Sequence, residues 1–408
     1  MIVGGAAALA APQPLLERQL RVGVVALGGL GGSSRVACEL ARGLAARRHA
    51  TWLLSSPRPW WHTDAPAGVD LVALPVPREP RPHEAAWVDP LADALVRAVL
   101  AYDLQVLSVH YGVGLAAAAV EARRRLARRG RALRVCATLH GTDVTSFGED
   151  PPQADALARA LRACDAVTTV SAWLADAAER TLGLPVRPEV IANGVDTELF
   201  HPADEALRAA LGSGPRERPV LCHASNFRPI KRPLDAIEIL ARLHRDAIAA
   251  ELVMVGDGPL RTACHAHADA LGLSSHVRFM PPASPAALAE LLRTVDLSLV
   301  TSESESFGLF ALESMASGVP VLGTRCGGLQ EVLAADRSGE LAHALLADVG
   351  DVDALARLAG TALAVPSHMQ RLRHLALVLG RTAFPRARQV LAFAELLGRT
   401  AGDAGGTA

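Results

Sequence analysis

The sequence predicts an α/β protein built from two doubly wound parallel sheets. Short apolar runs of strand length alternate with segments of helical period in both halves of the chain, which is typical of parallel sheets covered by helices. A stretch rich in Ala, Gly, Pro and charge, residues 201–219, separates the halves and is the predicted linker. The 408 residues are enough for two domains, each with a core of its own.

The first domain is predicted over residues 21–200. Its first strand, Arg21–Leu27, runs into the Gly-rich turn of residues 28–34, followed by a helix over residues 35–47. Such a turn lets the backbone approach a phosphate closely, although tight turns also use glycine for steric reasons alone. The remaining predicted elements are strands at residues 51–55, 69–74, 104–111, 135–139, 165–170 and 189–192, loops at 57–66 and 75–82, a helix at 89–101 and a helix capped by Ser171.

The second domain is predicted over residues 220–383. Strands are expected at residues 220–224, 251–255, 277–281 and 296–300, with a helix at 234–243. Residues 384–397 form an amphipathic last helix, and residues 1–20 and 398–408 are expected to be a loose extension and a disordered tail. The apolar start of the chain lacks the positive region of a signal peptide.

Composition excludes several classes of protein. Half of the residues are apolar but only 4% are aromatic, so Ala, Leu and Val must fill the cores. The net charge of −1 argues against a nucleic-acid partner. Six cysteines lack metal-type spacing, which favours reduced thiols in a cytoplasmic protein. No run reaches the roughly 18 apolar residues of a membrane span, and we expect a soluble homo-oligomer without cofactor or metal.

The most informative stretch is residues 302–321. A buried strand precedes it, and Ser306 is the expected N-cap of a helix that stops at Gly318. Glu305 and Glu313 bracket the turn with seven residues between them. Phe307, Gly308 and Leu309 between them offer backbone N–H groups at a helix N-terminus, where an anion is favoured. This layout suits a nucleotide-sugar, although an ordinary strand and helix with two solvated Glu would give the same spacing.

Taken together with Gly327-Gly328, this block resembles the retaining glycosyltransferases of family 4, which have the GT-B fold. Within that family the motifs are most similar to the N-acetyl-α-D-glucosaminyl L-malate synthases of bacillithiol biosynthesis. The segments that carry the second resemblance are residues 31–33, 109–111, 139–145, 148–151, 225–232, 255–259 and 303–309. The chain departs from this group at Ser34-Arg35, at residues 112–115 and at Asn193-Gly194, all on the acceptor side.

The resemblance implies roles for the donor-side residues. Glu313 would hold ribose hydroxyls, Glu305 a sugar hydroxyl, and main-chain groups near Met280 the uracil. Arg228, Lys231 and the turn at Gly31-Gly32 would neutralise the diphosphate, since Arg acts as a fork and Lys as a point charge.

On the acceptor side, Ser33, Tyr111 and Thr142 are the expected contacts, with His140 near the donor sugar. Arg35 would either supply a new contact to the carboxylate of the acceptor or face water. The expected partners are a UDP-sugar donor and a small hydroxy-acid acceptor.

The implied reaction is transfer of N-acetylglucosamine from UDP-N-acetylglucosamine to L-malate with retention. Arg228, Lys231, His140 and Glu305 would act in catalysis, and fixed cations would replace a metal. A lipid or glycan acceptor is also compatible with the family, and the basic segment 123–134 would favour it through membrane contact; a solvated helix face is the preferred interpretation of that segment. An epimerase acting on the same sugar nucleotide, or a binding protein without turnover, would fit the donor-side motifs as well.

Overall fold

The computed structural model describes residues 19–28, 31–56, 68–75, 87–148, 150–203, 218–335 and 339–402. The predicted extension before residue 19, both predicted Pro-rich loops apart from residue 75, Glu149, most of the predicted linker and the last six residues lie outside the described part. Among the described helices, none has both the length and the apolar character that crossing a membrane requires.

Strands of the first half form one parallel sheet in the order β3-β2-β1-β4-β5-β6-β7. Apolar runs with almost no exposed side chain, such as the five residues of β4, account for its position between helix layers. The strands are β1 (Arg21–Leu27), β2 (Ala50–Ser56), β3 (Val69–Ala73), β4 (Val106–His110), β5 (Arg134–Leu139), β6 (Ala166–Thr169) and β7 (Glu189–Val190).

Strands of the second half form another parallel sheet in the order β10-β9-β8-β11-β12-β13. They are β8 (Val220–Ala224), β9 (Glu251–Val255), β10 (Val277–Met280), β11 (Leu297–Val300), β12 (Val321–Thr324) and β13 (Leu346–Ala347). The strand order reverses at β1 in the first sheet and at β8 in the second. In open α/β sheets, ligands bind at the carboxyl ends of strands beside such a reversal.

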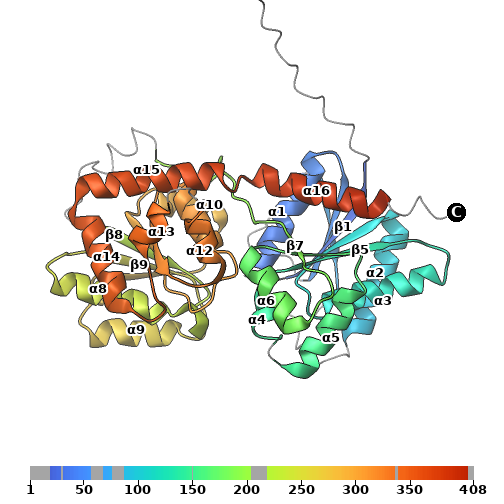
Figure 1. The fold of residues 1–408 in the computed structure, drawn as a ribbon, viewed down its shortest axis with the longest axis horizontal. Coiled ribbons are helices and arrows are strands. Elements are labelled where there is room, and N and C mark those ends of the chain that lie inside the picture. Colours follow the sequence, from blue (N-terminus) through green and yellow to red (C-terminus); the bar gives the residue numbers. More distant parts are fainter. Residues whose placement is uncertain are drawn as a thin grey trace, which may run out of the picture.

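Helices cover the faces of both sheets (Figure 1). Those of the first domain are α1 (Gly32–Ala46), α2 (Val88–Tyr102), α3 (Leu115–Ala127), α4 (Thr142–Thr145), α5 (Pro151–Arg162) and α6 (Ala172–Leu182). Those of the second are α8 (Pro233–Arg245), α9 (Arg261–Ala270), α10 (Pro285–Leu292), α11 (Leu309–Ala316), α12 (Gly327–Leu333), α13 (Glu340–Leu345), α14 (Val352–Ala364) and α15 (Pro366–Thr382). The predicted fold, two Rossmann-like domains, is confirmed.

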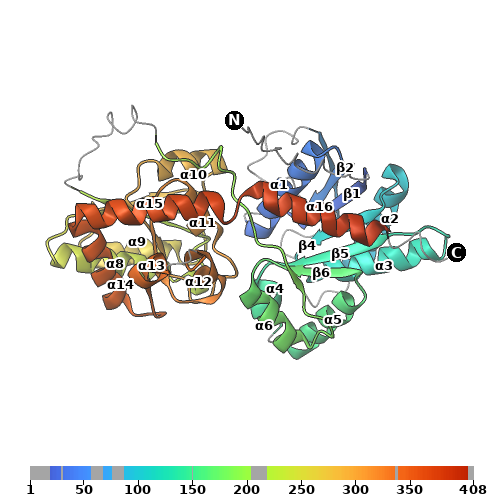
Figure 2. The same cartoon turned by 45° about the horizontal axis from the view of Figure 1, so that its top comes forward.

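The last helix, α16 (Arg386–Gly402), crosses back to the first domain, as predicted (Figures 1 and 2). It follows α15, which packs on α11 of the second domain. Val390, Phe393 and Leu397 of α16 are buried in the same core cluster as Val22 and Leu40 of the first domain. The chain that forms the end of the second domain therefore also completes the core of the first.

Three predicted helix limits were wrong. α1 begins at Gly32 rather than near Arg35, because Gly31 is extended and serves as its N-cap. α11 begins at Leu309 with Gly308 as N-cap, so Ser306 lies outside the helix. α16 continues to Gly402, five residues beyond the predicted end, because Thr400 is buried against the first domain. Residues 398–402 are thus helical rather than part of a disordered tail. The predicted cap Ser171 is confirmed, since its Oγ accepts from Leu174 N at 3.1 Å.

Candidate active site between the two domains

A cavity of about 410 Å³ lies between the two domains, within the size range of small-ligand sites. Every residue predicted to bind or act lines it except Met280. First-domain residues reach it from the ends of β1, β4 and β5, and second-domain residues from the ends of β8 and β11. This follows from the parallel direction of the strands, because the carboxyl ends of parallel strands share one edge of the sheet. The predicted roles of these residues remain proposals.

The first turn of α1 forms part of the cavity wall. Gly31, Gly32, Ser33 and Arg35 all line the cavity. A Cβ added at Gly32 would lie 3.4 Å from a methyl group of Leu309 in the second domain, so this turn packs closely on the start of α11. A side chain at Gly32 would therefore meet the second domain directly, whereas a Cβ at Gly31 would lie 3.8 Å from Ser33 Oγ of its own helix.

His140 follows β5 and is held by a second, buried histidine. His110, at the end of β4, places Nδ1 3.1 Å from Nε2 of His140, and Ser108 Oγ lies 3.3 Å from His110 Nε2. Burial lowers the pKa of His140 to about 3 and holds the pKa of His110 well below its usual range. Both rings are therefore neutral at physiological pH, and one must donate to the other.

Asp143 fixes the loop that carries His140. Its buried carboxylate accepts from the backbone N–H groups of His140 and Gly141, at 3.0 and 2.8 Å, and of Gly112 at 3.2 Å. Burial raises the pKa of Asp143, while these donors act in the opposite direction. Gly141 adopts a φ of 135°, and a Cβ there would collide with Ser306 Oγ of the second domain. The loop is thus shaped for contact with the opposite domain.

Tyr111 and Thr142 were predicted together on the acceptor side, and the structure brings them together. Tyr111 Oη lies 3.1 Å from Thr142 Oγ1. Burial raises the pKa of the phenol, so Tyr111 stays protonated. The pair offers hydroxyl groups, without charge, to whatever occupies the first-domain side of the cavity.

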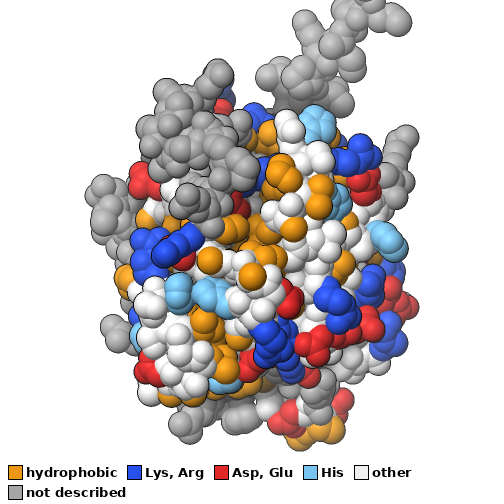
Figure 3. All heavy atoms as spheres, turned by 90° about the vertical axis from the view of Figure 1, so that its left-hand side faces the viewer, with side chains coloured by type: hydrophobic (Ala, Val, Ile, Leu, Met, Phe, Trp, Pro, Cys, Tyr) orange, Lys and Arg blue, Asp and Glu red, His pale blue; other side chains and the backbone are white. Residues whose placement is uncertain are grey.

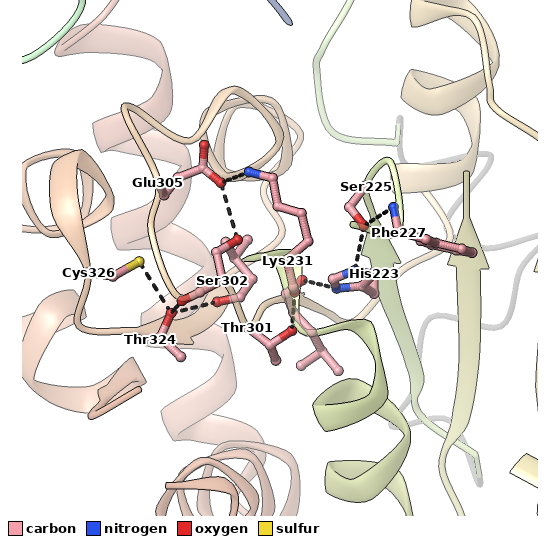
Figure 4. A network of polar contacts seen from close by, with 11 residues as sticks. His223, Ser225, Phe227, Lys231, Thr301, Ser302, Glu305, Thr324 and Cys326 are labelled. Atoms are coloured by element: carbon pink, nitrogen blue, oxygen red, sulfur yellow. Dashed lines mark hydrogen bonds and ion pairs between the residues drawn. The ribbon is translucent and has the colours of Figure 1, made fainter. Parts of the chain in front are cut away.

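The cations of the second domain lie between β8 and α8. Lys231 ends a short 3₁₀ turn, Pro229–Lys231. Its ammonium is 2.6 Å from Glu305 Oε2, and Ser302 Oγ donates to the same carboxylate oxygen at 3.3 Å (Figure 4). Arg228 is exposed at the cavity and has no ion-pair partner among the described residues. Lys231 is also the single lysine of the chain.

The segment before Lys231 is held by its own hydrogen bonds. His223 Nε2 lies 2.9 Å from Ser225 Oγ, which accepts from Phe227 N at 3.2 Å (Figure 4). Burial lowers the pKa of His223 to about 4, so its ring is neutral. Thr301 Oγ1 donates to the carbonyl of Lys231 at 3.1 Å, which ties the turn to the end of β11.

Glu313, predicted to meet ribose, is paired across the cavity with Arg35. Arg35 Nη1 lies 2.5 Å from Glu313 Oε1, and the Glu313 side chain is 5% exposed. Burial raises the pKa of Glu313 to about 7, although the guanidinium opposes this rise. Arg35 therefore contacts a carboxylate of the protein itself rather than facing water. Its predicted contact with the carboxylate of an acceptor remains a proposal.

Met280 is the predicted site residue that does not line the cavity. Its carbonyl already accepts from Gly256 N at 3.1 Å and from Arg261 Nη1 at 3.2 Å. Ala283, Pro285 and Leu288, a few residues further along, line the cavity instead. A hydrogen bond from a base to the carbonyl of Met280 would have to compete with these two bonds.

Sequence reasoning missed several cavity residues. Asn193 is buried there, and its Oδ1 accepts from Gln389 of α16 at 3.1 Å. Ser225, Asn226 and Ser302 also line the cavity, whereas His110 lies behind His140. The signal available for all of them was their position directly at or after a predicted strand.

Two further contacts join the domains beside the cavity. Ser171 Oγ donates to the carbonyl of Ser306 at 2.6 Å. Glu331 of α12 accepts from Ala172 N at 3.0 Å and from Trp173 N at 2.5 Å, so a second-domain carboxylate caps the N-terminus of α6. The domains are therefore held together by polar contacts as well as by α16.

The basic segment 123–134 is largely neutralised in the fold. Arg125 pairs with Asp89, Asp93 and Glu121, while Arg123 and Arg134 both pair with Asp165. Arg131 also has an acidic partner on the first domain. On the outer face of the second domain, basic and acidic side chains lie next to one another (Figure 3). This outer face of the second domain does not present the single-sign surface that an anionic membrane attracts.

The described residues contain no cluster of three or more metal-ligating side chains. The six cysteines are all free thiols. Burial raises the pKa of each thiol, which disfavours the reactive thiolate form.

Comparison with known proteins places the chain in a family. Residues 30–199 match the model described as Glycosyltransferase Family 4, and residues 188–376 match Glycosyl transferases group 1. An N-acetyl-α-D-glucosaminyl L-malate synthase from Bacillus anthracis is 30% identical over 343 residues, covering 83% of this chain and 86% of that protein. The chain belongs to the family-4 glycosyltransferases.

Other relatives match over shorter stretches. A D-inositol 3-phosphate glycosyltransferase from Rhodococcus opacus (strain B4) is 36% identical over 203 residues, which is 46% of this chain and 45% of that enzyme. The chain thus spans less than half the length of this relative.

Solved structures confirm the GT-B fold. The structure of Anabaena HepE in complex with UDP and glucose matches with a TM-score of 0.76, at 19% identity, over 93% of this chain and 99% of that one. A sucrose-phosphate synthase from Thermosynechococcus elongatus matches with a TM-score of 0.77, at 20% identity, over 94% and 99%. At these identities the likeness concerns the fold alone.

Proposed function

We propose that this glycosyltransferase moves N-acetylglucosamine from UDP-N-acetylglucosamine to the hydroxyl of L-malate, with retention at the anomeric carbon. The observation that carries the proposal is the set of cations in one cavity. Arg228 and Lys231 line it from the second domain and Arg35 from the first. Arg228 and Lys231 would contact the diphosphate of the donor, and Arg35 would contact the carboxylate of the acceptor. The likeness to the malate synthase extends over both domains and supports the same pair of substrates.

The chemistry rests on charge. Breaking the bond at the anomeric carbon places negative charge on the departing diphosphate. Lys231, which is held by Glu305, and Arg228, which is exposed at the cavity, would stabilise that charge more than the ground state and so lower the barrier. The leaving phosphate itself would take the proton of the attacking hydroxyl on the same face of the sugar.

The donor would be oriented by carboxylates and main chain. Glu305, paired with Lys231, would accept from a hydroxyl of the sugar, and Glu313 from the ribose. The backbone N–H groups at Phe307, Gly308 and Leu309 would meet the phosphates. His140, neutral and held by His110, would contact the sugar.

The acceptor would lie against the first domain. Ser33, Tyr111 and Thr142 would contact its hydroxyl and carboxyl groups, and Arg35 would neutralise a carboxylate. A second candidate acceptor is D-inositol 3-phosphate. Its support is the sequence match to a D-inositol 3-phosphate glycosyltransferase, which covers only part of this chain. This acceptor too is a small anion with hydroxyl groups, so Arg35 suits it equally.

A transfer assay tests the proposal. Radiolabelled UDP-N-acetylglucosamine is incubated with L-malate, other small hydroxy acids, D-inositol 3-phosphate and a lipid acceptor. We expect labelled product with malate, whose anomeric configuration NMR then determines. Product formed only with inositol phosphate or only with lipid would identify that compound, instead of malate, as the acceptor. Release of an epimerised sugar without any acceptor would identify an epimerase. UDP binding without product in any reaction would show that the protein binds the nucleotide but does not transfer the sugar.

A further inference from the structure

The ion pair between Arg35 and Glu313 joins the two domains through the cavity. Arg35 comes from α1, which follows β1, and Glu313 from α11, which follows β11. Nη1 and Oε1 are 2.5 Å apart, and the side chains are 17% and 5% exposed. A charge pair so well shielded from water separates only where each group gains another partner, because a buried charge without a partner is strongly unfavourable.

Arg35 has a second carboxylate partner on its own helix. Its Nε donates to Glu39 Oε1 at 3.0 Å, one turn further along α1. The guanidinium also lies over the ring of Phe200, 5.5 Å from its centroid. Because Glu39 holds Nε independently of the second domain, Nη1 can leave Glu313 while the side chain stays anchored and charge-compensated.

Two ligands compete for this pair under the proposed function. Glu313 is the carboxylate proposed for the ribose hydroxyls of the donor, and the guanidinium now covers it. On the other side, the remaining first-domain residues proposed to meet the acceptor, Ser33, Tyr111 and Thr142, are uncharged. Arg35 is the one arginine or lysine that the first domain contributes to the described lining.

We propose that Arg35 changes partner during the reaction cycle, leaving Glu313 when the donor's ribose takes that carboxylate and then binding the carboxylate of the acceptor. The switch makes acceptor binding depend on the donor. It rests on the proposed function for the identity of both ligands. Since binding linkage is reciprocal, the acid must strengthen donor binding by the same factor.

The test is calorimetric titration of UDP and of L-malate, each alone and in the presence of the other, at about pH 8. In the unmodified protein, saturating UDP should lower the malate Kd about tenfold or more, within the usual range of coupling between sites. In Glu313→Gln, Arg35 is free from the start, so malate should bind without UDP nearly as tightly as it binds the unmodified protein with UDP.

Substitution of Arg35 separates the switch from a mere contact. Arg35→Gln should bind malate weakly with or without UDP, and should bind UDP several-fold more tightly because the competitor for Glu313 is gone. Arg35→Met removes the charge but keeps a long side chain that can cover the ring of Phe200, and it serves if Arg35→Gln does not fold. Arg124→Gln is the matched control, since Arg124 forms an exposed pair with Glu121 on α3 and is outside the cavity; it should behave like the unmodified protein.

The outcomes are distinguishable. If malate binds the unmodified protein equally well without UDP, or if UDP promotes malate binding equally in Arg35→Gln, the switch is wrong. If no acid binds under any condition while UDP does, the proposed acceptor is wrong. In that case the UDP affinity of the Arg35 variants tests whether Arg35 competes with UDP for Glu313. An unchanged UDP affinity in Arg35→Gln, or in Arg35→Met if that variant alone folds, overturns the switch.

Discussion

The ammonium of Lys231 lies 2.6 Å from Oε2 of Glu305. The cation proposed for the leaving diphosphate and the acid proposed for the sugar are thus already in contact. In a UDP-sugar the phosphate and the sugar ring meet at the anomeric carbon, the point where the bond breaks. The pair therefore marks where this junction would lie, and it keeps both side chains in place before the donor arrives.

Lys231→Ala should lower kcat by about two powers of ten, roughly 3 kcal/mol, because one preorganised charge at the leaving group is lost. The donor KM should change much less, since the charge acts most strongly in the transition state. Arg232→Gln is the control, because Arg232 pairs with Asp235 and is not part of the cavity wall. Steady-state kinetics check both variants, and an unchanged kcat in Lys231→Ala would remove Lys231 from the mechanism.

The single lysine also permits a chemical test. An amine-reactive acylating reagent should modify Lys231 slowly, because its ammonium is paired and partly buried. UDP should slow this modification further, by at least severalfold, if the diphosphate binds there. Peptide mapping by mass spectrometry measures the rate, and the α-amino group of the chain is the internal control. Equal labelling with and without UDP would place the nucleotide elsewhere.

The ionisation of Glu313 predicts a pH dependence of donor use. Burial raises the pKa of Glu313 to about 7, so the carboxylate proposed to accept ribose hydroxyls is lost as pH falls through about 7. Donor kcat/KM should therefore fall up to tenfold per unit below about pH 7 and level off above it. Glu313→Gln should have lower activity and should not show this fall of kcat/KM at low pH. A fall that persists in the variant would mean that another group titrates in this range.

The same pKa shift affects stability in the opposite direction: a higher pH favours donor use but lowers the free energy of unfolding. Between the ordinary pKa of a glutamate and about 7, the folded protein holds a proton on Glu313 that the unfolded chain has released. The free energy of unfolding contributed by this group therefore decreases as pH rises through that window. Urea denaturation at about pH 5 and about pH 8 should show the unmodified protein losing stability relative to Glu313→Gln.

The positions of the strands and of their ends could be predicted from the sequence, because buried apolar runs and the polar residues that follow them are local features. These features alone place Tyr111, His140, Arg228 and Glu305 at the ligand-binding ends of strands. The pairing of Arg35 with Glu313 could not be predicted in this way, because it depends on how the two domains face each other.

The helix limits failed for a related reason. Ser306 has the side chain of a good N-cap, yet its carbonyl accepts from Ser171 of the other domain. Gly308, with a φ of 97°, takes the cap position. Thr400 is a poor helix former that tertiary burial keeps helical. In each case a long-range contact prevailed over a local preference.

Activity should survive metal removal, because Arg228, Lys231 and the N–H groups near Phe307 would carry the charge of the diphosphate themselves. The measurement is transfer rate after dialysis against EDTA, with and without added Mg²⁺. We expect the two rates to agree within about twofold. A loss that Mg²⁺ restores would show that the leaving group needs a metal ion as well.

Phe393→Ala should destabilise the protein by about 3–5 kcal/mol, the usual cost of removing a buried aromatic side chain. Phe393 of α16 is 1% exposed, packs with the first-domain core and lies 5.7 Å, between ring centroids, from His110. Leu391→Ala on the same helix is the matched control, since Leu391 is 37% exposed, and should stay within about 0.5 kcal/mol. Urea denaturation measures both. Because His110 holds His140, kcat should also fall in Phe393→Ala under conditions where the variant remains folded. Retention of full stability in this variant would mean that α16 is not fixed to the first domain through this ring.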